Sequence, residues 1–131
     1  MNEKQSISKG RLWTSYGLQG LVSGMFLMGI VNNLMQTEMA VKGSLDMGYP
    51  EGIAPILGAV QLIALALYVF PKTSILGAAI ITAWLGGAVA THVIHRDPMS
   101  LTLFPVIFGV IVWVAIWLRD KQIQAVFPFK K

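Results

Sequence analysis

The sequence predicts an all-α integral membrane protein, folded as an antiparallel bundle of four transmembrane helices. Hydrophobic residues make up 55% of the chain and charged residues only 12%, about half the charged share of a typical soluble domain. A soluble domain of 131 residues would need many more polar groups to cover its surface. Four long apolar stretches, separated by polar segments, account for most of the chain. We therefore expect a single transmembrane domain over residues 1–131.

The first predicted span covers about residues 13–35. At a rise of about 1.5 Å per residue, a helix of this length crosses a hydrocarbon core about 30 Å thick. The apolar run is too long for the core of a cleaved signal peptide, so we expect it to stay in the protein. Gly20 and Gly24 form a GxxxG motif, which lets another helix backbone come close. We expect both glycines to serve helix packing.

Residues 37–52 are expected to form a loop, and this loop is long enough to fold over one end of the bundle. Its last part, Gly48 to Gly52, has the composition of a turn, and Pro50 disfavours helix at the preceding residue.

The second span, about residues 53–70, contains one strongly polar side chain, that of Gln61. A side-chain amide inside a bilayer is costly unless it bonds to a neighbouring helix. We therefore expect Gln61 to face the interior of the bundle rather than lipid.

The third span, about residues 74–93, follows a very short turn and must lie antiparallel to the second. It is rich in small residues, which fall into two rows at helical spacing and are expected to pack against helices on both sides. These residues are Ala79, Ala83, Gly86, Gly87 and Ala90. Asp97 and Pro98 end the helix, and the fourth span follows over about residues 101–118.

The distribution of Lys and Arg predicts the orientation. Eight of the ten lie in the N-terminal segment, the turn at Lys72 or the C-terminal tail, whereas Lys42 and Arg96 lie on the opposite side. By the positive-inside rule both termini are cytoplasmic, and segments 37–52 and 95–100 face outward. The same rule accounts for the net charge of +4 without nucleic-acid binding.

Polar side chains concentrate in the outward half of the predicted bundle, whereas the half near the termini carries no comparable set. Amides end the first span and interrupt the second, and threonine and histidine end the third. We expect these groups, with one tryptophan beside them, to line a single outward-facing pocket covered by the Gly48–Gly52 turn. The candidate ligand-binding residues are Asn32, Asn33, Gln36, Gln61, Trp84, Thr91, His92 and His95.

Several interpretations of this polar set remain open. In the simplest, polar residues at helix ends bond only to backbone or water. In the second, the pocket binds a quinone or a lipid headgroup: His92, Asn32 and Gln61 donate hydrogen bonds, and Trp84 lines an apolar slot. In the third, thioethers and imidazoles hold a soft metal such as Cu(I), although no tight ligand spacing appears and we assign no metal ligand. The methionines concerned are Met35, Met39, Met47 and Met99.

A fourth interpretation is an accessory subunit that assembles with another membrane or redox protein through its small-residue faces. The sequence shows no paired acids in a span, no Ser-His-Asp constellation and no glycine-rich phosphate loop. The chain has no cysteine, which excludes disulfides and thiolate metal sites. We therefore assign no catalytic residue and favour a partner subunit over an autonomous enzyme.

Several short motifs, in order, resemble the DoxX-like family of small four-span bacterial membrane proteins over roughly residues 12–120. The motifs are Gly48-Tyr-Pro50, Ile56-Leu-Gly-Ala59, Pro71-Lys-Thr-Ser-Ile-Leu-Gly-Ala78, Gly87-Ala-Val-Ala-Thr-His92 and Phe104-Pro105.

The resemblance implies a four-helix transmembrane bundle in a bacterial inner membrane. The family takes its name from proteins linked to a thiosulfate:quinone oxidoreductase, and a shared fold does not transfer that activity to this chain. Two positions depart from the family pattern. Gln61 stands where members often carry an acid, and Asn32-Asn33 stand where they often carry a lysine. Proton-carrying or ion-paired roles at those positions are not transferred.

Overall fold

A computed structural model describes residues 6–130 of the chain. Lys4 and Lys131, which enter the charge count, lie outside these residues. The described part is helical and contains no strand, which confirms the predicted all-α fold class. Its helices are α1 (Lys9–Leu34), α2 (Glu38–Asp46), α3 (Ala54–Val69), α4 (Ser74–His95), α5 (Met99–Trp117) and α6 (Lys121–Val126).

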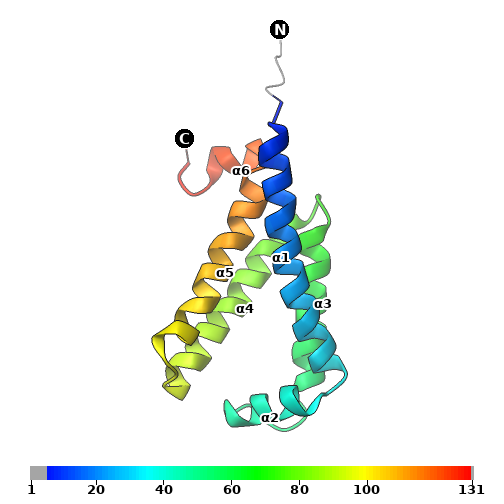
Figure 1. The fold of residues 1–131 in the computed structure, drawn as a ribbon, viewed down its shortest axis with the longest axis vertical. Helices are drawn as coiled ribbons and strands as arrows, with labels where there is room; N and C mark the ends of the chain where they lie inside the picture. The colour runs from blue at the N-terminus through cyan, green and yellow to red at the C-terminus, as the bar shows by residue number, and fades with distance from the viewer. Residues whose placement is uncertain (1–5, 131) are drawn as a thin grey trace.

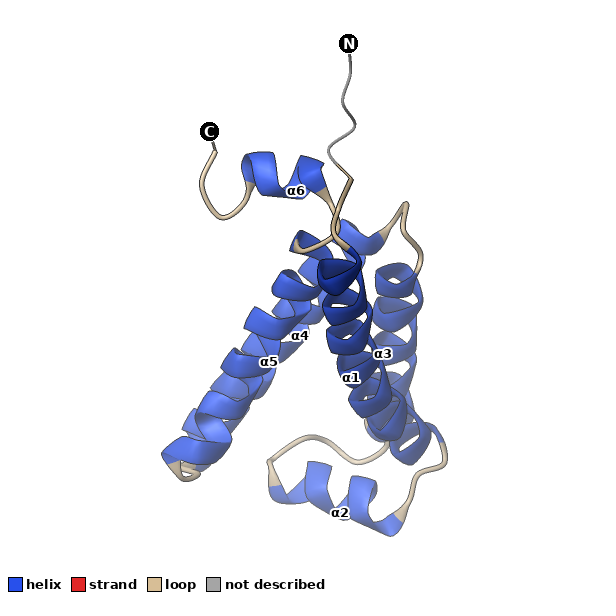
Figure 2. Ribbon diagram, turned by 45° about the horizontal axis from the view of Figure 1, so that its top comes forward, coloured by secondary structure: helices blue, strands red, loops and turns tan. Residues whose placement is uncertain are grey.

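The long helices of the described chain form two pairs. α1 contacts α3 and α5, and α4 contacts the same two helices. The α1/α3 pair and the α4/α5 pair lie close together at the end that carries the termini and diverge toward α2 (Figures 1 and 2). The bundle is therefore closed at the terminal end and open at the end where α2 lies.

Tyr68 connects three helices at the closed end. Its side chain is fully buried, and its hydroxyl donates to the carbonyl oxygen of Val112 in α5 at 2.8 Å. Gln19 of α1 donates to the carbonyl oxygen of Tyr68 at 3.3 Å. A Cβ atom added to Gly77 would lie 2.2 Å from the backbone nitrogen of Tyr68. Only glycine therefore lets α4 approach α3 this closely.

A second group of polar contacts joins α1 to the end of α5. The Ser15 hydroxyl, which is fully buried, donates to the carbonyl oxygen of Ala115. Arg119 donates to the Ser15 oxygen at 2.9 Å, and its guanidinium lies 5.0 Å from the ring centroid of Tyr16. The prediction that this half of the bundle carries no comparable polar set is wrong. Ser15 and Gln19 lie one turn apart on the buried face of α1, and that i, i+4 pair was a signal in the sequence.

The small residues expected to pack helices together are exposed within the single chain. They are Gly20, Gly24, Ala79, Ala83, Gly86, Gly87 and Ala90. A Cβ added to any of the four glycines among them would meet nothing within 4 Å. Close approaches occur instead at Gly77, Gly29 and Gly58, and the last two lie against Gln61 and Leu34. Packing of the exposed set against another chain stays a prediction.

By length and composition, α1, α4 and α5 can cross a membrane. α3 is apolar but has 16 residues, a length of about 24 Å. Pro55 stands in its first turn and Pro71 follows its end, and proline is tolerated at both positions but not between them. The predicted spans correspond to these four helices, and the crossing by α3 stays a prediction.

Residues 37–52, expected to be a loop, contain helix α2. The Thr37 hydroxyl accepts from the backbone N–H of Ala40 at 3.3 Å and caps the helix. In the tail, Asp120 caps α6 in the same way by accepting from Gln122 at 2.8 Å. A threonine or aspartate ahead of helix-forming residues signals the start of a helix. The prediction of a loop over residues 37–52 was therefore wrong for Glu38–Asp46, and the glycine and proline residues that favour a turn lie after this helix.

Candidate ligand-binding cleft

A cleft of about 520 Å³ lies at the open end of the bundle. Its wall comes from α1, α2, the α2–α3 connection, α3 and α4. α2 crosses this end of the molecule (Figure 2) and contributes Met39 and Ser44 to the wall, and Met47 follows directly after the helix. The Gly48–Gly52 turn, which was expected to cover the pocket, contributes only Tyr49 to the wall, and α2 supplies most of the cover.

Most of the cleft wall is apolar. Trp84 and Ala83 of α4 and Leu57 of α3 line it, together with Met39 of α2 and Met47, which follows α2. An aromatic ring between aliphatic and thioether groups suits a flat, apolar molecule, because the ring packs face on and methionine adapts to irregular shapes.

Asn33 of α1 supplies one polar edge of the cleft. Its side-chain nitrogen donates to the Oε1 atom of Gln61 in α3 at 2.8 Å. Gln61 is 8% exposed and lies against Gly29, so it faces α1 as expected. Gln61 does not line the cleft. It fixes the Asn33 side chain through this hydrogen bond.

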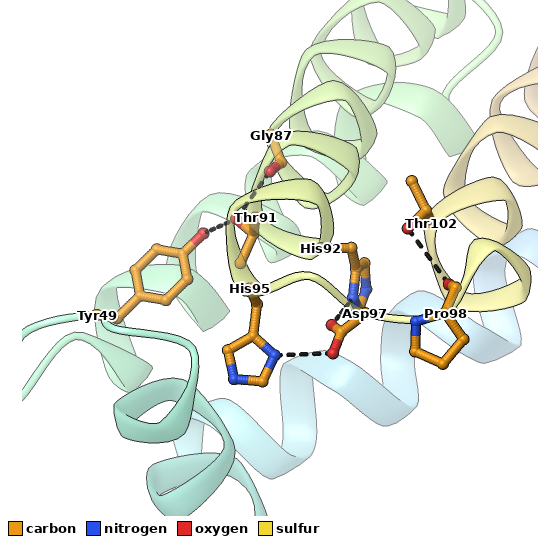
Figure 3. Close-up of polar contacts among 8 residues, drawn as sticks. All are labelled: Tyr49, Gly87, Thr91, His92, His95, Asp97, Pro98 and Thr102. Carbon is orange, nitrogen blue, oxygen red and sulfur yellow. Dashed lines mark hydrogen bonds and ion pairs between the residues drawn. The ribbon is translucent and has the colours of Figure 1, made fainter.

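Thr91 of α4 and Tyr49 form a hydrogen-bonded chain at a second polar edge of the cleft. The Thr91 hydroxyl lies 2.8 Å from the carbonyl oxygen of Gly87 and 2.8 Å from the Tyr49 hydroxyl. Figure 3 draws both contacts. This contact fastens the α2–α3 connection to α4 across the open end.

His92, which lines the cleft, belongs to a His–Asp–His cluster at the end of α4 (Figure 3). The Nδ1 atom of His92 lies 2.6 Å from one carboxylate oxygen of Asp97, and the Nδ1 atom of His95 lies 2.7 Å from the other. The hydrogen bonds from the two imidazoles lower the pKa of Asp97 below its ordinary value. Asp97 is therefore ionised at neutral pH and orients both rings.

The backbone conformation of Arg96 brings Asp97 back onto the helix end. Arg96 has a φ of 61°, in the left-handed region that non-glycine residues seldom adopt. The N–H of Arg96 donates to the carbonyl oxygen of Val93 at 3.1 Å, and the N–H of Asp97 donates to the carbonyl oxygen of His92 at 3.0 Å. This pair of bonds is a Schellman motif. It places the carboxylate beside both histidines.

α1 ends in the same way at the open end of the bundle. Gln36 has a φ of 50°, and the N–H of Thr37 bonds to the carbonyl oxygen of Asn32 at 3.1 Å. The Asn32 side chain bonds locally, to the carbonyl oxygen of Met28 at 2.8 Å and to the Thr37 hydroxyl at 3.0 Å.

The structure thus brings together half of the predicted set. Asn33, Trp84, Thr91 and His92 line the cleft, whereas Gln61 supports Asn33 and His95 lies on the outer side of Asp97. Asn32 and Gln36 belong to the turn that ends α1. Sequence reasoning did not select Tyr49, Ser44 or Met47 as wall residues. Recognition of α2 as an amphipathic helix would have pointed to Ser44, and Met47 follows directly after this helix.

Metal ligation finds little geometric support. Within residues 6–130 no group of three or more His, Cys, Asp or Glu side chains is arranged to hold a metal ion. Met35 and Met99 are exposed and do not line the cleft.

A larger groove of about 590 Å³ lies between α4 and α5 near the terminal end. Its wall is apolar and includes Trp113, Trp117 and Phe127 from the tail. The rings of Trp113 and Phe127 stack at 4.7 Å, and Trp117 donates to the Phe127 carbonyl oxygen at 3.0 Å. This groove holds the tail against the bundle and lacks the polar set of the cleft.

Comparison with known proteins agrees with this architecture. A search of curated proteins and of solved structures finds no significant match. The family model described as the DoxX-like family matches residues 17–115, which span α1 to α5 and the entire cleft. The chain is therefore a multi-pass membrane protein that belongs to the DoxX-like family.

Proposed function

We propose that this protein is a membrane component of a redox system and binds a quinone-class molecule in the cleft beneath α2. Such a molecule has a flat ring with oxygen substituents and an apolar tail. The observation that carries the proposal is the composition of the wall, in which Trp84 and aliphatic groups adjoin Asn33, Thr91 and His92. The volume of about 520 Å³ falls within the roughly 300–1,000 Å³ of small-molecule sites.

Polar groups at two edges of an apolar slot suit a ring with oxygen atoms at opposite positions. Asn33 lies on α1, and His92 and Thr91 lie on α4, so a ring beside Trp84 reaches polar groups in both helix pairs. Gln61 and Asp97 fix Asn33 and His92, which lowers the cost of ordering these side chains when a ligand binds. A phospholipid headgroup with its acyl chains is the alternative occupant.

We further propose a bacterial inner membrane as the location, with both termini in the cytoplasm and the cleft open to the outside. The excess of Lys and Arg near the termini supports this orientation. The resemblance to small bacterial membrane proteins supports the choice of membrane.

The second candidate function is that of a partner subunit, and the exposed glycines of α1 favour it. Gly20 and Gly24 have open space where a Cβ would stand, which leaves room for a helix of another membrane protein. This role and ligand binding are compatible, because the glycines lie outside the cleft wall.

Thermal unfolding of the purified protein in detergent micelles tests ligand binding. A short-chain ubiquinone should raise the unfolding temperature of the wild type, and a hundredfold excess over Kd corresponds to about 2.7 kcal/mol. His92→Ala should lose most of this increase, whereas Lys72→Ala, in the exposed α3–α4 turn, should keep it. No increase in the wild type with either this ubiquinone or the corresponding ubiquinol would disprove binding of a quinone-class molecule. An equal increase in both variants would place the ligand elsewhere, and an increase only with phospholipid would assign the cleft to lipid.

A further inference from the structure

The hydrogens of the hydroxyl and imidazole groups at the edges of the cleft are already used within the protein. Thr91 must donate its one hydroxyl hydrogen to Gly87, because a carbonyl oxygen can only accept. The Tyr49 hydroxyl, 2.8 Å from the Thr91 oxygen, must then donate to Thr91. Tyr49 therefore offers a ligand its oxygen lone pair and no hydrogen.

The same accounting holds for His92. An ionised carboxylate has acceptors only, so the Nδ1 atoms of His92 and His95 carry the hydrogens in their bonds to Asp97. The Nδ1 hydrogen of His92, on a ring that lines the cleft, is therefore directed at Asp97 and is not available to a ligand.

Ser44 and Asn33 complete the edges. The Ser44 hydroxyl donates to the carbonyl oxygen of Val41 at 2.9 Å, which leaves its lone pairs. Asn33 gives one amide hydrogen to Gln61 and keeps one hydrogen and its oxygen. The polar edges thus present mainly acceptors.

We propose that the cleft selects a ligand that donates hydrogen bonds, and so prefers the hydroxylated ring of a quinol or phenol to the carbonyl ring of a quinone. The ligand hydroxyl donates to the Tyr49 oxygen, and Thr91 acts as the positioning residue that holds the Tyr49 hydrogen away from the ligand. A quinone carbonyl at the same place would set two acceptors against each other and leave both unpaired. This inference rests on the proposed binding of a quinone-class ring.

Two ligand pairs that differ only in hydrogen-bond donation test the preference. The first pair is a short-chain ubiquinol, kept reduced without oxygen, and the corresponding ubiquinone. The second pair is 4-octylphenol and its methyl ether, which avoids redox chemistry. Equilibrium binding to the protein in micelles should favour the donor of each pair about tenfold or more.

Substitutions of the acceptor side chains test whether these residues cause the preference for hydrogen-bond donors. Tyr49→Phe and Ser44→Ala each remove one acceptor and should reduce the ratio of the two affinities toward one, whereas Lys72→Ala should keep the wild-type ratio. Thermal unfolding of each variant checks that it folds, and two independent substitutions keep the test decisive if one fails.

The outcomes separate this inference from the proposed function. Equal affinities within each pair, or tighter binding of the quinone and the ether, would overturn donor selection and leave ring binding intact. Binding of no ligand in either pair would overturn both. A donor preference that persists unchanged in Tyr49→Phe and Ser44→Ala would also overturn it, because the acceptors would then lie elsewhere.

Discussion

Asp97 shows at the scale of a single residue how a loop side chain orders a helix end. It stands just beyond α4, and its carboxylate accepts from His92 and His95. Arg96 makes this geometry possible by adopting a backbone conformation that costs about 1 kcal/mol or more outside glycine. The sequence revealed both histidines and the aspartate as neighbours, but the left-handed turn that joins them has no signature without a glycine.

The titration of Asp97 provides the first prediction. Because the bonds from the imidazoles lower its pKa in the folded state, the cluster stabilises that state above the unfolded pKa of Asp97. This stabilisation is lost as the pH falls through the lowered value. Carboxyl NMR of aspartate-labelled protein should show one resonance that titrates below the ordinary range of aspartate.

His92→Ala removes the bond that contributes most to lowering the pKa. In this variant the midpoint should move up toward the ordinary aspartate value. An unchanged midpoint would show that His92 does not bond to Asp97 in solution.

At the scale of the elements, close helix approach depends on particular glycines, and composition alone does not identify them. α4 is rich in small residues, yet those predicted to pack are exposed, and contact with α3 depends on Gly77. Small-residue spacing predicts that a helix can be approached closely. The spacing does not determine which face of the helix the neighbouring helix contacts. That face depends on the tilt of each helix pair, and no local sequence pattern encodes the tilt.

Gly77→Ala should destabilise the protein by about 3 kcal/mol or more, because the new methyl group would overlap the backbone of Tyr68, which cannot move aside. Gly20→Ala is the matched control: its methyl group meets nothing within 4 Å and alanine favours helix. Reversible unfolding in mixed micelles measures both variants. Equal stability of the two would contradict the backbone contact between α3 and α4.

At the scale of the whole molecule, the fold class and the four apolar helices could be predicted from the sequence, since composition and run length determine them. The half of the site on α1 and α4 could also be predicted, because its polar side chains interrupt apolar helices. Helix α2 was not predicted, because the segment that contains it ends in glycine and proline residues that favour a turn. The divergence of the two helix pairs was beyond prediction, since it results from contacts such as that of Tyr68 with Val112, 44 residues apart.

The orientation in the membrane can be tested on the whole molecule, since the chain has no cysteine and any introduced thiol is unique. Glu51→Cys lies in the turn after α2 and should react with a membrane-impermeant maleimide in intact cells. Lys72→Cys lies in the α3–α4 turn and should react only after the cells are opened. The reverse pattern would invert the proposed orientation.

The exposure of Ala83 and Gly87, which also line the cleft, bears on how a ligand arrives. Because these side chains are short, they leave the cleft accessible from the outside of the helix bundle. We therefore expect a hydrophobic molecule dissolved among the acyl chains to enter the cleft from the bilayer without crossing water. Its association rate should then follow its concentration in the bilayer rather than in solution. Lengthening an inert tail should raise occupancy through partitioning, even if the contacts made by the ring stay the same.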